Sequence, residues 1–203
     1  MDMIEFSIND KKVKARQGWT ILETTRHHGV DIPTLCYHES VAPSGACRLC
    51  MVEIKEGDWS KLVASCIYPV QAGISVYTET ERVQNVRHWI FEMLLAACPA
   101  SHEIKEMATK YGVVSTRFPV HDPEQTCMVC GLCSRVCEEV VGLSAISTVD
   151  RGVHKKVSSP FLRPTDICVA CGCCVSVCPT GAMQAIFDSV RGEPVMQLMQ
   201  LTV

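Results

Sequence analysis

The chain has 203 residues, of which 47% are hydrophobic and 14 are cysteines, and its formal net charge is −3. This charge gives no indication of nucleic acid or of an anionic membrane as a partner, and the hydrophobic content argues against global disorder. No stretch approaches the roughly 20 apolar residues that span a bilayer, and the first twelve residues lack the apolar core of a signal peptide. We therefore expect a cytoplasmic protein of one or two domains.

Residues 1–80 are predicted to form a small mixed sheet with one helix packed across it. Four stretches have the residue pattern of strands, at 3–8, 12–16, 50–54 and 74–78. The first two flank Asn9 and Asp10, a pair that favours a hairpin turn. Thr20 can cap a helix that ends near Gly29.

Residues 81–126 are predicted to be a helical linker region. Apolar side chains recur every three or four positions over residues 80–98, which gives a helix with one apolar face, and Pro99 ends it. A second helix is expected to begin at Ser101, a capping residue, and to end near Gly112.

A duplicated cysteine motif dominates the predicted third domain, residues 127–203. Two copies of C-x2-C-x2-C-x3-C are offset by 41 residues at every position: Cys127, Cys130, Cys133 and Cys137, then Cys168, Cys171, Cys174 and Cys178. Three cysteines at this spacing wrap one face of a [4Fe–4S] cluster, and the fourth reaches the other cluster. The predicted ligand sets are therefore crossed: Cys127, Cys130, Cys133 and Cys178 for one cluster, and Cys137, Cys168, Cys171 and Cys174 for the other.

Gly131 and Gly172 lie inside these ligand loops, where the backbone has to turn tightly. The same cysteines allow two alternatives, zinc sites and disulfides. Zinc modules usually separate two C-x-x-C pairs by a longer loop, and a reducing compartment disfavours disulfides. On this pattern, residues 127–191 resemble a bacterial-type ferredoxin with two [4Fe–4S] clusters, and Pro179 follows Cys178 as it does in that motif.

A second set of four cysteines lies in the first domain, at Cys36, Cys47, Cys50 and Cys66, with the spacing C-x10-C-x2-C-x15-C. The strings PTLC and GACRLCMVE resemble the [2Fe–2S] region that opens the largest peripheral-arm subunit of respiratory complex I and the iron-only hydrogenases. They also resemble the diaphorase iron–sulfur subunit of NAD-reducing hydrogenases. The resemblance implies a β-grasp fold and one [2Fe–2S] cluster. The alternative is scattered structural thiols, and Cys66 is selected only by its order along the chain.

The chain departs from that group after the linking helix, where many members have a [4Fe–4S] site with one histidine and three cysteines. The corresponding stretch contains only Cys98 and His102, and the next cysteine is Cys127. We therefore predict that this cluster is absent. Cys98 and Cys173 remain unassigned and are predicted to be small buried residues rather than ligands.

The predicted fold class is α+β: an N-terminal β-grasp [2Fe–2S] domain, a helical linker and a C-terminal domain of the two-[4Fe–4S] ferredoxin type. The sequence has no dinucleotide fingerprint, phosphate loop, zinc-protease motif or nucleophile elbow. We therefore predict no active site and a role in passing single electrons through one [2Fe–2S] and two [4Fe–4S] clusters.

The resemblance implies that the chain is an iron–sulfur subunit of an oxidoreductase complex. Its partners would be a flavin-binding NAD(H) subunit and a catalytic subunit, such as a hydrogenase, a formate dehydrogenase or an electron-bifurcating assembly. The alternatives are a stand-alone multi-cluster ferredoxin and a zinc-stabilised interaction module. Residues 127–191 contain five acidic and six basic residues, a balance that favours a subunit over a freely diffusing carrier. The apolar segment 194–201 is predicted either to dock on a partner or to pack on its own domain.

Overall fold

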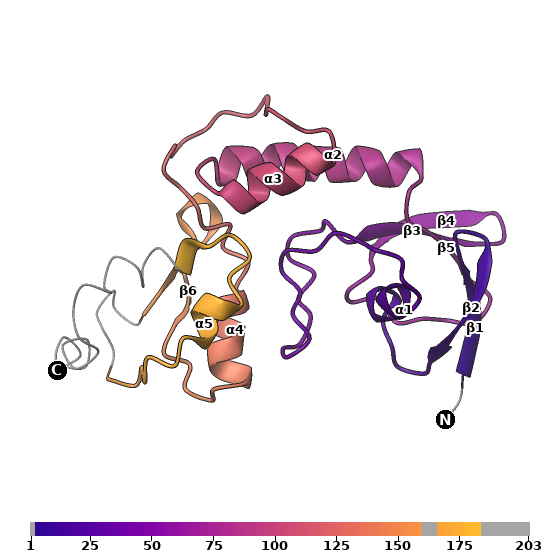
Figure 1. The fold of residues 1–203 in the computed structure, drawn as a ribbon, viewed down its shortest axis with the longest axis horizontal. Coiled ribbons are helices and arrows are strands. Elements are labelled where there is room, and N and C mark those ends of the chain that lie inside the picture. The colour runs from indigo at the N-terminus through magenta and orange to yellow at the C-terminus, as the bar shows by residue number, and fades with distance from the viewer. Residues whose placement is uncertain (1–2, 160–165, 184–203) are drawn as a thin grey trace. The chain divides into compact units, whose positions relative to one another are not determined.

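The computed structural model describes residues 3–159 and 166–183 (Figure 1). The apolar segment 194–201 lies outside these residues. The chain divides into two compact units. The first unit comprises Met1–Tyr37, Pro43–Met93 and Ala108–Arg117, and the second comprises His38–Ala42, Leu94–Met107 and Phe118–Val203.

The first unit is built on one five-stranded sheet. Its strands are β1 (Met3–Ile8), β2 (Lys11–Arg16), β3 (Met51–Glu56), β4 (Trp59–Ala64) and β5 (Ser75–Tyr77), in the order β2-β1-β5-β3-β4. Strands β1 and β2 form one antiparallel hairpin, and β3 and β4 form another. Strand β5 lies between the hairpins, parallel to β1 and antiparallel to β3. This mixed sheet confirms the predicted α+β class.

The first hairpin turns at Asn9 and Asp10, as predicted. Both residues have positive φ, 47° and 66°, which short polar side chains tolerate better than other non-glycine residues. The register pairs Ile8 with Lys11, so the loop has two residues. The Asn9 side chain also accepts a hydrogen bond from the Thr78 N–H at 3.0 Å. The turn is thereby fixed to the end of β5.

The one strand of this sheet that the sequence pattern missed is β4. Its first half, Trp59-Ser60-Lys61, does not alternate apolar and polar residues, so the period-2 signal is weak there. Strand β4 forms because it pairs with β3 along the full length of both strands, from Met51 opposite Ala64 to Glu56 opposite Trp59.

Helix α1 (Ile21–His27) packs on the sheet through Ile21 and Leu22, which are fully buried. Thr20 caps it as predicted. The Thr20 hydroxyl accepts a hydrogen bond from the Glu23 N–H at 3.2 Å, and the Glu23 carboxylate accepts one from the Thr20 N–H at 2.7 Å. This reciprocal arrangement is a capping box. The unit's core contains further apolar residues of β1, β3 and β5, among them Phe6, Ile8, Val52, Ile54 and Val76.

Helices α2 (Glu81–Ala97) and α3 (His102–Lys110) follow the sheet. Helix α2 has the predicted extent within one residue at each end. The Ser101 hydroxyl accepts a hydrogen bond from the Ile104 N–H at 3.4 Å, so Ser101 caps α3 as expected. Within residues 3–159 and 166–183, the helices are all too short or too polar to cross a bilayer.

The second unit repeats one short helix after each cysteine loop. Helix α4 (Leu132–Glu139) and helix α5 (Cys173–Ser176) begin 41 residues apart, the same offset as the cysteines. Between them lie β6 (Ser147–Val149), the 3-10 helix η1 (Gly152–His154) and β7 (Lys156–Ser158). Strands β6 and β7 pair as an antiparallel hairpin. A small core joins Val41, Leu132, Val136 and Val177.

We predict that Thr20→Ala lowers the free energy of unfolding of the protein by about 1 kcal/mol, because it removes the acceptor for the Glu23 N–H. Anaerobic denaturant titration followed by circular dichroism measures the loss. Glu23→Gln is the matched control, since an amide oxygen also completes a capping box. Equal midpoints for Thr20→Ala and the wild-type protein would contradict the role of this cap.

Candidate metal centres

The four cysteines of the first unit are buried and lie in two pairs. The Cys36 Sγ accepts a hydrogen bond from the Cys47 N–H at 3.2 Å. The thiol of Cys47 also donates to Cys36 and lowers the pKa of Cys36 to about 5. In the same way, the thiol of Cys66 donates to Cys50 and lowers the pKa of Cys50 to about 6. The donors keep their protons, so the pKa of Cys47 and that of Cys66 are raised.

The β3–β4 hairpin brings Cys50 and Cys66 together. Met51 pairs with Ala64 at the open end of the hairpin, and the Ser65 N–H donates to the Cys50 carbonyl at 3.0 Å. Cys66, which the sequence placed only by its order, therefore lies beside Cys50. A [2Fe–2S] cluster takes four thiolates, and two pairs of thiols provide two for each iron.

The loop before Cys47 needs a glycine. Gly45 has φ 63°, and a Cβ atom at this position would lie 2.9 Å from Cδ1 of Ile67. The backbone conformation therefore favours glycine, whereas the exposed end of the Ile67 side chain can shift to accept a Cβ atom. Arg48, between Cys47 and Cys50, also has a positive φ of 60°, so the ligand loop curls back on itself.

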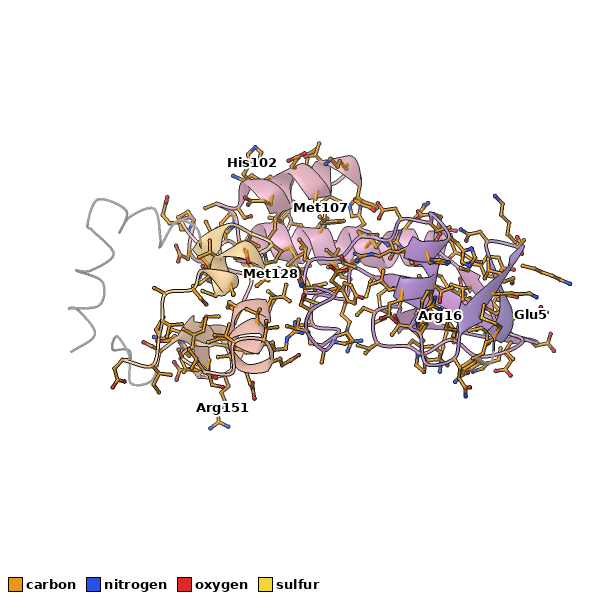
Figure 2. The ribbon with its side chains drawn as sticks, turned by 60° about the horizontal axis from the view of Figure 1, so that its bottom comes forward. Glu5, Arg16, His102, Met107, Met128 and Arg151 are labelled. Carbon is orange, nitrogen blue, oxygen red and sulfur yellow. The ribbon has the colours of Figure 1, made fainter. Side chains whose placement is uncertain are left out.

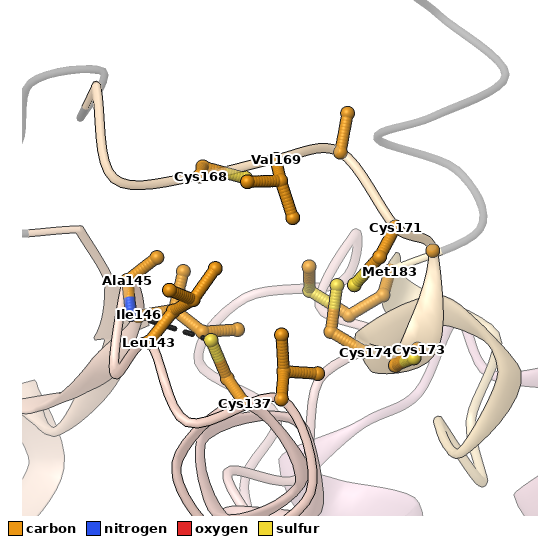
Figure 3. Close-up of a pocket in the computed structure, with 13 residues that line it drawn as sticks. Cys137, Leu143, Ala145, Ile146, Cys168, Val169, Cys171, Cys173, Cys174 and Met183 are labelled. Carbon is orange, nitrogen blue, oxygen red and sulfur yellow. Dashed lines mark hydrogen bonds between the residues drawn. The ribbon is translucent and has the colours of Figure 1, made fainter.

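The second unit contains two cavities lined by cysteines of the duplicated motif. Cys137, Cys168, Cys171 and Cys174 line a cavity of about 120 Å³ together with Cys173, and Figure 3 shows these five side chains along its wall. Cys127, Cys130, Cys133 and Cys178 line the other cavity. The structure thus groups the cysteines as the crossed scheme does. A cavity needs roughly 10–15 Å³ to hold one water molecule. The cavity beside Cys137 is therefore large enough for a group of several atoms.

The backbone of the two ligand loops repeats in detail. Val129 and Ala170 occupy equivalent positions and both have φ 52°, and Gly131 and Gly172 both have φ 77°. A positive φ is rare for a β-branched residue such as Val129, and strain of this kind concentrates at functional sites. The strained turn lets the Val129 N–H donate to the Cys127 Sγ at 3.4 Å.

Further hydrogen bonds reach the cysteine sulfurs. The Ala145 N–H donates to the Cys137 Sγ at 3.3 Å, as the dashed line in Figure 3 shows. The Thr180 hydroxyl, 3% exposed, lies 3.8 Å from the Cys178 Sγ. Donors to ligand sulfurs stabilise the more negative state of a cluster. Sequence reasoning missed Thr180, because nothing in the cysteine spacing marks it.

Burial makes three of these thiols poor thiolates on their own. Desolvation raises the pKa of Cys133 to about 12 and also raises the pKa of Cys127 and that of Cys174. A thiol in such a place loses its proton when a bound cation offsets the charge. The donor set and its surroundings therefore fit a metal cluster.

The two unassigned cysteines differ from each other. Cys98 is fully buried, as predicted, and desolvation raises its pKa to about 12. The prediction that Cys173 is buried is wrong, because it is the first residue of α5 and lies partly at the surface beside Cys171. The side chain of His102 is 86% exposed and pairs with Glu106.

Residues 38–42 lie between Cys36 and Cys47 in sequence but belong to the second unit. Val41, 6% exposed, packs against Leu132 and Val136 of α4. The Ala42 N–H donates to the Glu139 carboxylate at 2.6 Å, and the Arg135 guanidinium donates to the Ala42 carbonyl. Sequence reasoning missed these contacts between residues 38–42 and α4. The one available signal was the C-x10-C gap, which is six residues longer than the C-x4-C gap of plant-type ferredoxins.

Two family models match the chain. Residues 1–81 match a 2Fe-2S iron-sulfur cluster binding domain, and residues 126–182 match a 4Fe-4S dicluster domain. The chain is an iron–sulfur protein. The first match covers the four cysteines of the first unit, and the second covers both copies of the duplicated motif.

Curated relatives agree with the resemblance inferred from the motifs. A subunit of the NADH-quinone oxidoreductase of Rickettsia prowazekii is 29% identical over 90% of this chain and 30% of the relative. The 78 kDa subunit of the mitochondrial NADH-ubiquinone oxidoreductase of Candida albicans is 30% identical over 73% of this chain and 24% of the relative. The alpha subunit of the NADPH-Fe(3+) oxidoreductase of Geobacter sulfurreducens is 32% identical over 74% of this chain and 20% of the relative. The alignments thus span less than a third of each relative.

A solved structure resembles the chain over most of its length. It is an NAD+-reducing [NiFe]-hydrogenase in the H2-reduced state, with a TM-score of 0.68 and 26% sequence identity, covering 77% of this chain and 75% of the other. The predicted resemblance and the order of the two cluster domains are confirmed.

We predict that Val41→Ala lowers the temperature at which the protein loses its visible absorbance by about 4–8 °C, because removing two buried methyl groups costs about 2 kcal/mol. The control is Val140→Ala, since Val140 follows α4 and is 52% exposed. A shift of the same size in both variants would contradict the packing role of Val41.

Proposed function

We propose that this protein relays single electrons through one [2Fe–2S] cluster and two [4Fe–4S] clusters as the iron–sulfur subunit of a larger oxidoreductase. The observation that carries the proposal is the pair of cavities in the second unit, each lined by one crossed set of four cysteines. A cluster held by four cysteines has no free iron position for a substrate, so its chemistry is one-electron transfer.

The proposed ligands of the [2Fe–2S] cluster are Cys36, Cys47, Cys50 and Cys66. Those of the two [4Fe–4S] clusters are the crossed sets Cys127, Cys130, Cys133, Cys178 and Cys137, Cys168, Cys171, Cys174. The paired thiols of the first unit and the shared cavities of the second support these sets. We retain residues 1–80, 81–126 and 127–203 as the [2Fe–2S] domain, the linker and the dicluster domain.

The polypeptide positions and insulates the sulfurs. Apolar side chains, among them Leu143, Ile146 and Met183, line the larger cavity beside its cysteines, although Cys168 and Cys171 are exposed on its other side. Backbone donors at Val129 and Ala145 direct N–H groups at ligand sulfurs. Solvent exclusion and hydrogen bonds of this kind set the potential of a cluster.

The relatives support a place in a multi-subunit complex. Three of them are named as subunits of NADH or NADPH oxidoreductases. We propose a flavin-binding NAD(H) subunit as one partner and a catalytic redox subunit as the other, for example a hydrogenase, a formate dehydrogenase or part of an electron-bifurcating assembly. We also propose a cytoplasmic location, where thiols stay reduced and available to iron.

We predict about ten irons per chain in protein purified without air, two from the [2Fe–2S] cluster and four from each [4Fe–4S] cluster. Cys137→Ser is expected to reduce the content to about six, because it removes a ligand of one cubane. Iron analysis and electron paramagnetic resonance of the reduced protein measure both values.

Cys173→Ser is the matched control, since Cys173 lies in the same cavity wall and is not a proposed ligand. Loss of iron in Cys173→Ser with full iron in Cys137→Ser would refute the ligand assignment. A colourless protein that contains zinc would refute the electron-relay function. If the protein purifies alone, as one monodisperse species with all of its clusters, a stand-alone ferredoxin would be favoured.

We predict that Thr180→Val lowers the reduction potential of the cluster bound by Cys178. The lost hydrogen bond to sulfur is worth about 1 kcal/mol, which corresponds to about 40 mV for a one-electron couple. Potentiometric titration followed by electron paramagnetic resonance measures the shift. Thr148→Val in β6 is the control, and an equal shift in both variants would show that the Thr180 hydroxyl has no specific effect.

A further inference from the structure

The β6–β7 hairpin concentrates the positive charge of the second unit. Among the described residues of that unit, three of the five Lys and Arg side chains lie in this hairpin: Arg151, Lys155 and Lys156. The rest of the described unit carries eight acidic and two basic side chains. Within the part of the unit that the structure describes, the hairpin is thus a basic feature among mostly acidic side chains.

The tip of the hairpin, residues 150–156, is exposed at every position. Val153 lies in the middle of it and is 93% exposed, and Figure 2 shows the Arg151 side chain extending outward. Asp150, Arg151, His154 and Lys156 line an open hollow. The tip thus combines one exposed apolar side chain with charged neighbours in the sequence, and protein interfaces likewise combine apolar and polar groups.

The base of the same hairpin borders both cysteine-lined cavities. Val157 of β7 lines the cavity that contains Cys127 and Cys178, and Ile146, directly before β6, lines the cavity that contains Cys137. Val157 is four positions after Val153, a span of at most about 14 Å. A protein that docks at the tip therefore comes close to the proposed clusters.

We propose that residues 150–156 are a docking surface for the acidic face of a second electron-transfer protein. This inference rests on the proposed function. One electron passes between the docked protein and the clusters, so one partner is oxidised by one electron and the other is reduced by one, and no proton or bond moves. The tip is small, as in weak and transient redox encounters, and opposite charges steer and orient such encounters. A small anion is a poorer fit, because the hollow is open and its charged side chains are exposed.

The test compares two double charge reversals in the cluster-loaded protein. Lys155→Glu with Lys156→Glu alters the tip, and Lys11→Glu with Lys12→Glu makes the same change of charge at exposed positions of β2. The probe is an acidic [2Fe–2S] ferredoxin, and its binding is measured by isothermal titration calorimetry at an ionic strength of about 20 mM, where screening is weak. We expect the tip variant to weaken binding about tenfold or more, and the control to change it less than about twofold.

Electron exchange with the same ferredoxin is followed by stopped-flow absorbance. We expect its rate to fall in the tip variant together with the affinity, and the difference between the tip variant and the wild-type protein to disappear at about 500 mM salt. Oxidation by an uncharged quinone is expected to be equal in all variants. Equal effects of the two double reversals would overturn the proposal. So would loss of binding to anionic lipid vesicles in the tip variant while binding of the ferredoxin is unchanged. Absence of clusters or of any redox response would instead count against the proposed function.

Discussion

Gathering four cysteine sulfurs in a partly buried place is unfavourable unless a cation shares their charge, and the rest of this structure follows from that constraint. Without metal, burial raises the pKa of Cys133 to about 12, so this thiol keeps its proton, while Cys36 and Cys50 can lose theirs only because a neighbouring thiol donates a hydrogen bond to each. A bound cluster would supply the missing charge, so cluster binding and folding of the ligand loops would be coupled. The repeated positive φ at Val129 and Ala170 lies in these loops.

The sequence predicted well those features that are local or repeated. The 41-residue offset indicated two equivalent ligand loops, and the structure shows the same φ at Gly131 and Gly172. The turn at Asn9 and Asp10 and the cap at Thr20 are also local, since their chemistry depends on neighbours within a few residues. These elements carry their own signals in propensity and spacing.

The features that the sequence did not predict depend on partners far apart in the chain. Strand β4 is ordered by β3 rather than by its own pattern. Arg135 and Glu139 act on Ala42, 93 and 97 residues away. No period or motif links such positions, so a single sequence does not reveal them. Cys173 was misjudged because a cysteine next to a ligand can face either inward or outward.

Residues 38–42 lie between two proposed ligands of one cluster but are packed in the core of the unit that holds the other clusters. The two halves of this protein are therefore not interchangeable parts. A fragment that ends near residue 81 leaves Val41 without Leu132 and Val136, and a hybrid with a foreign dicluster domain needs a matching apolar site for this loop. In such a hybrid, residues 38–42 and α4 have to be exchanged together, because they pack on each other.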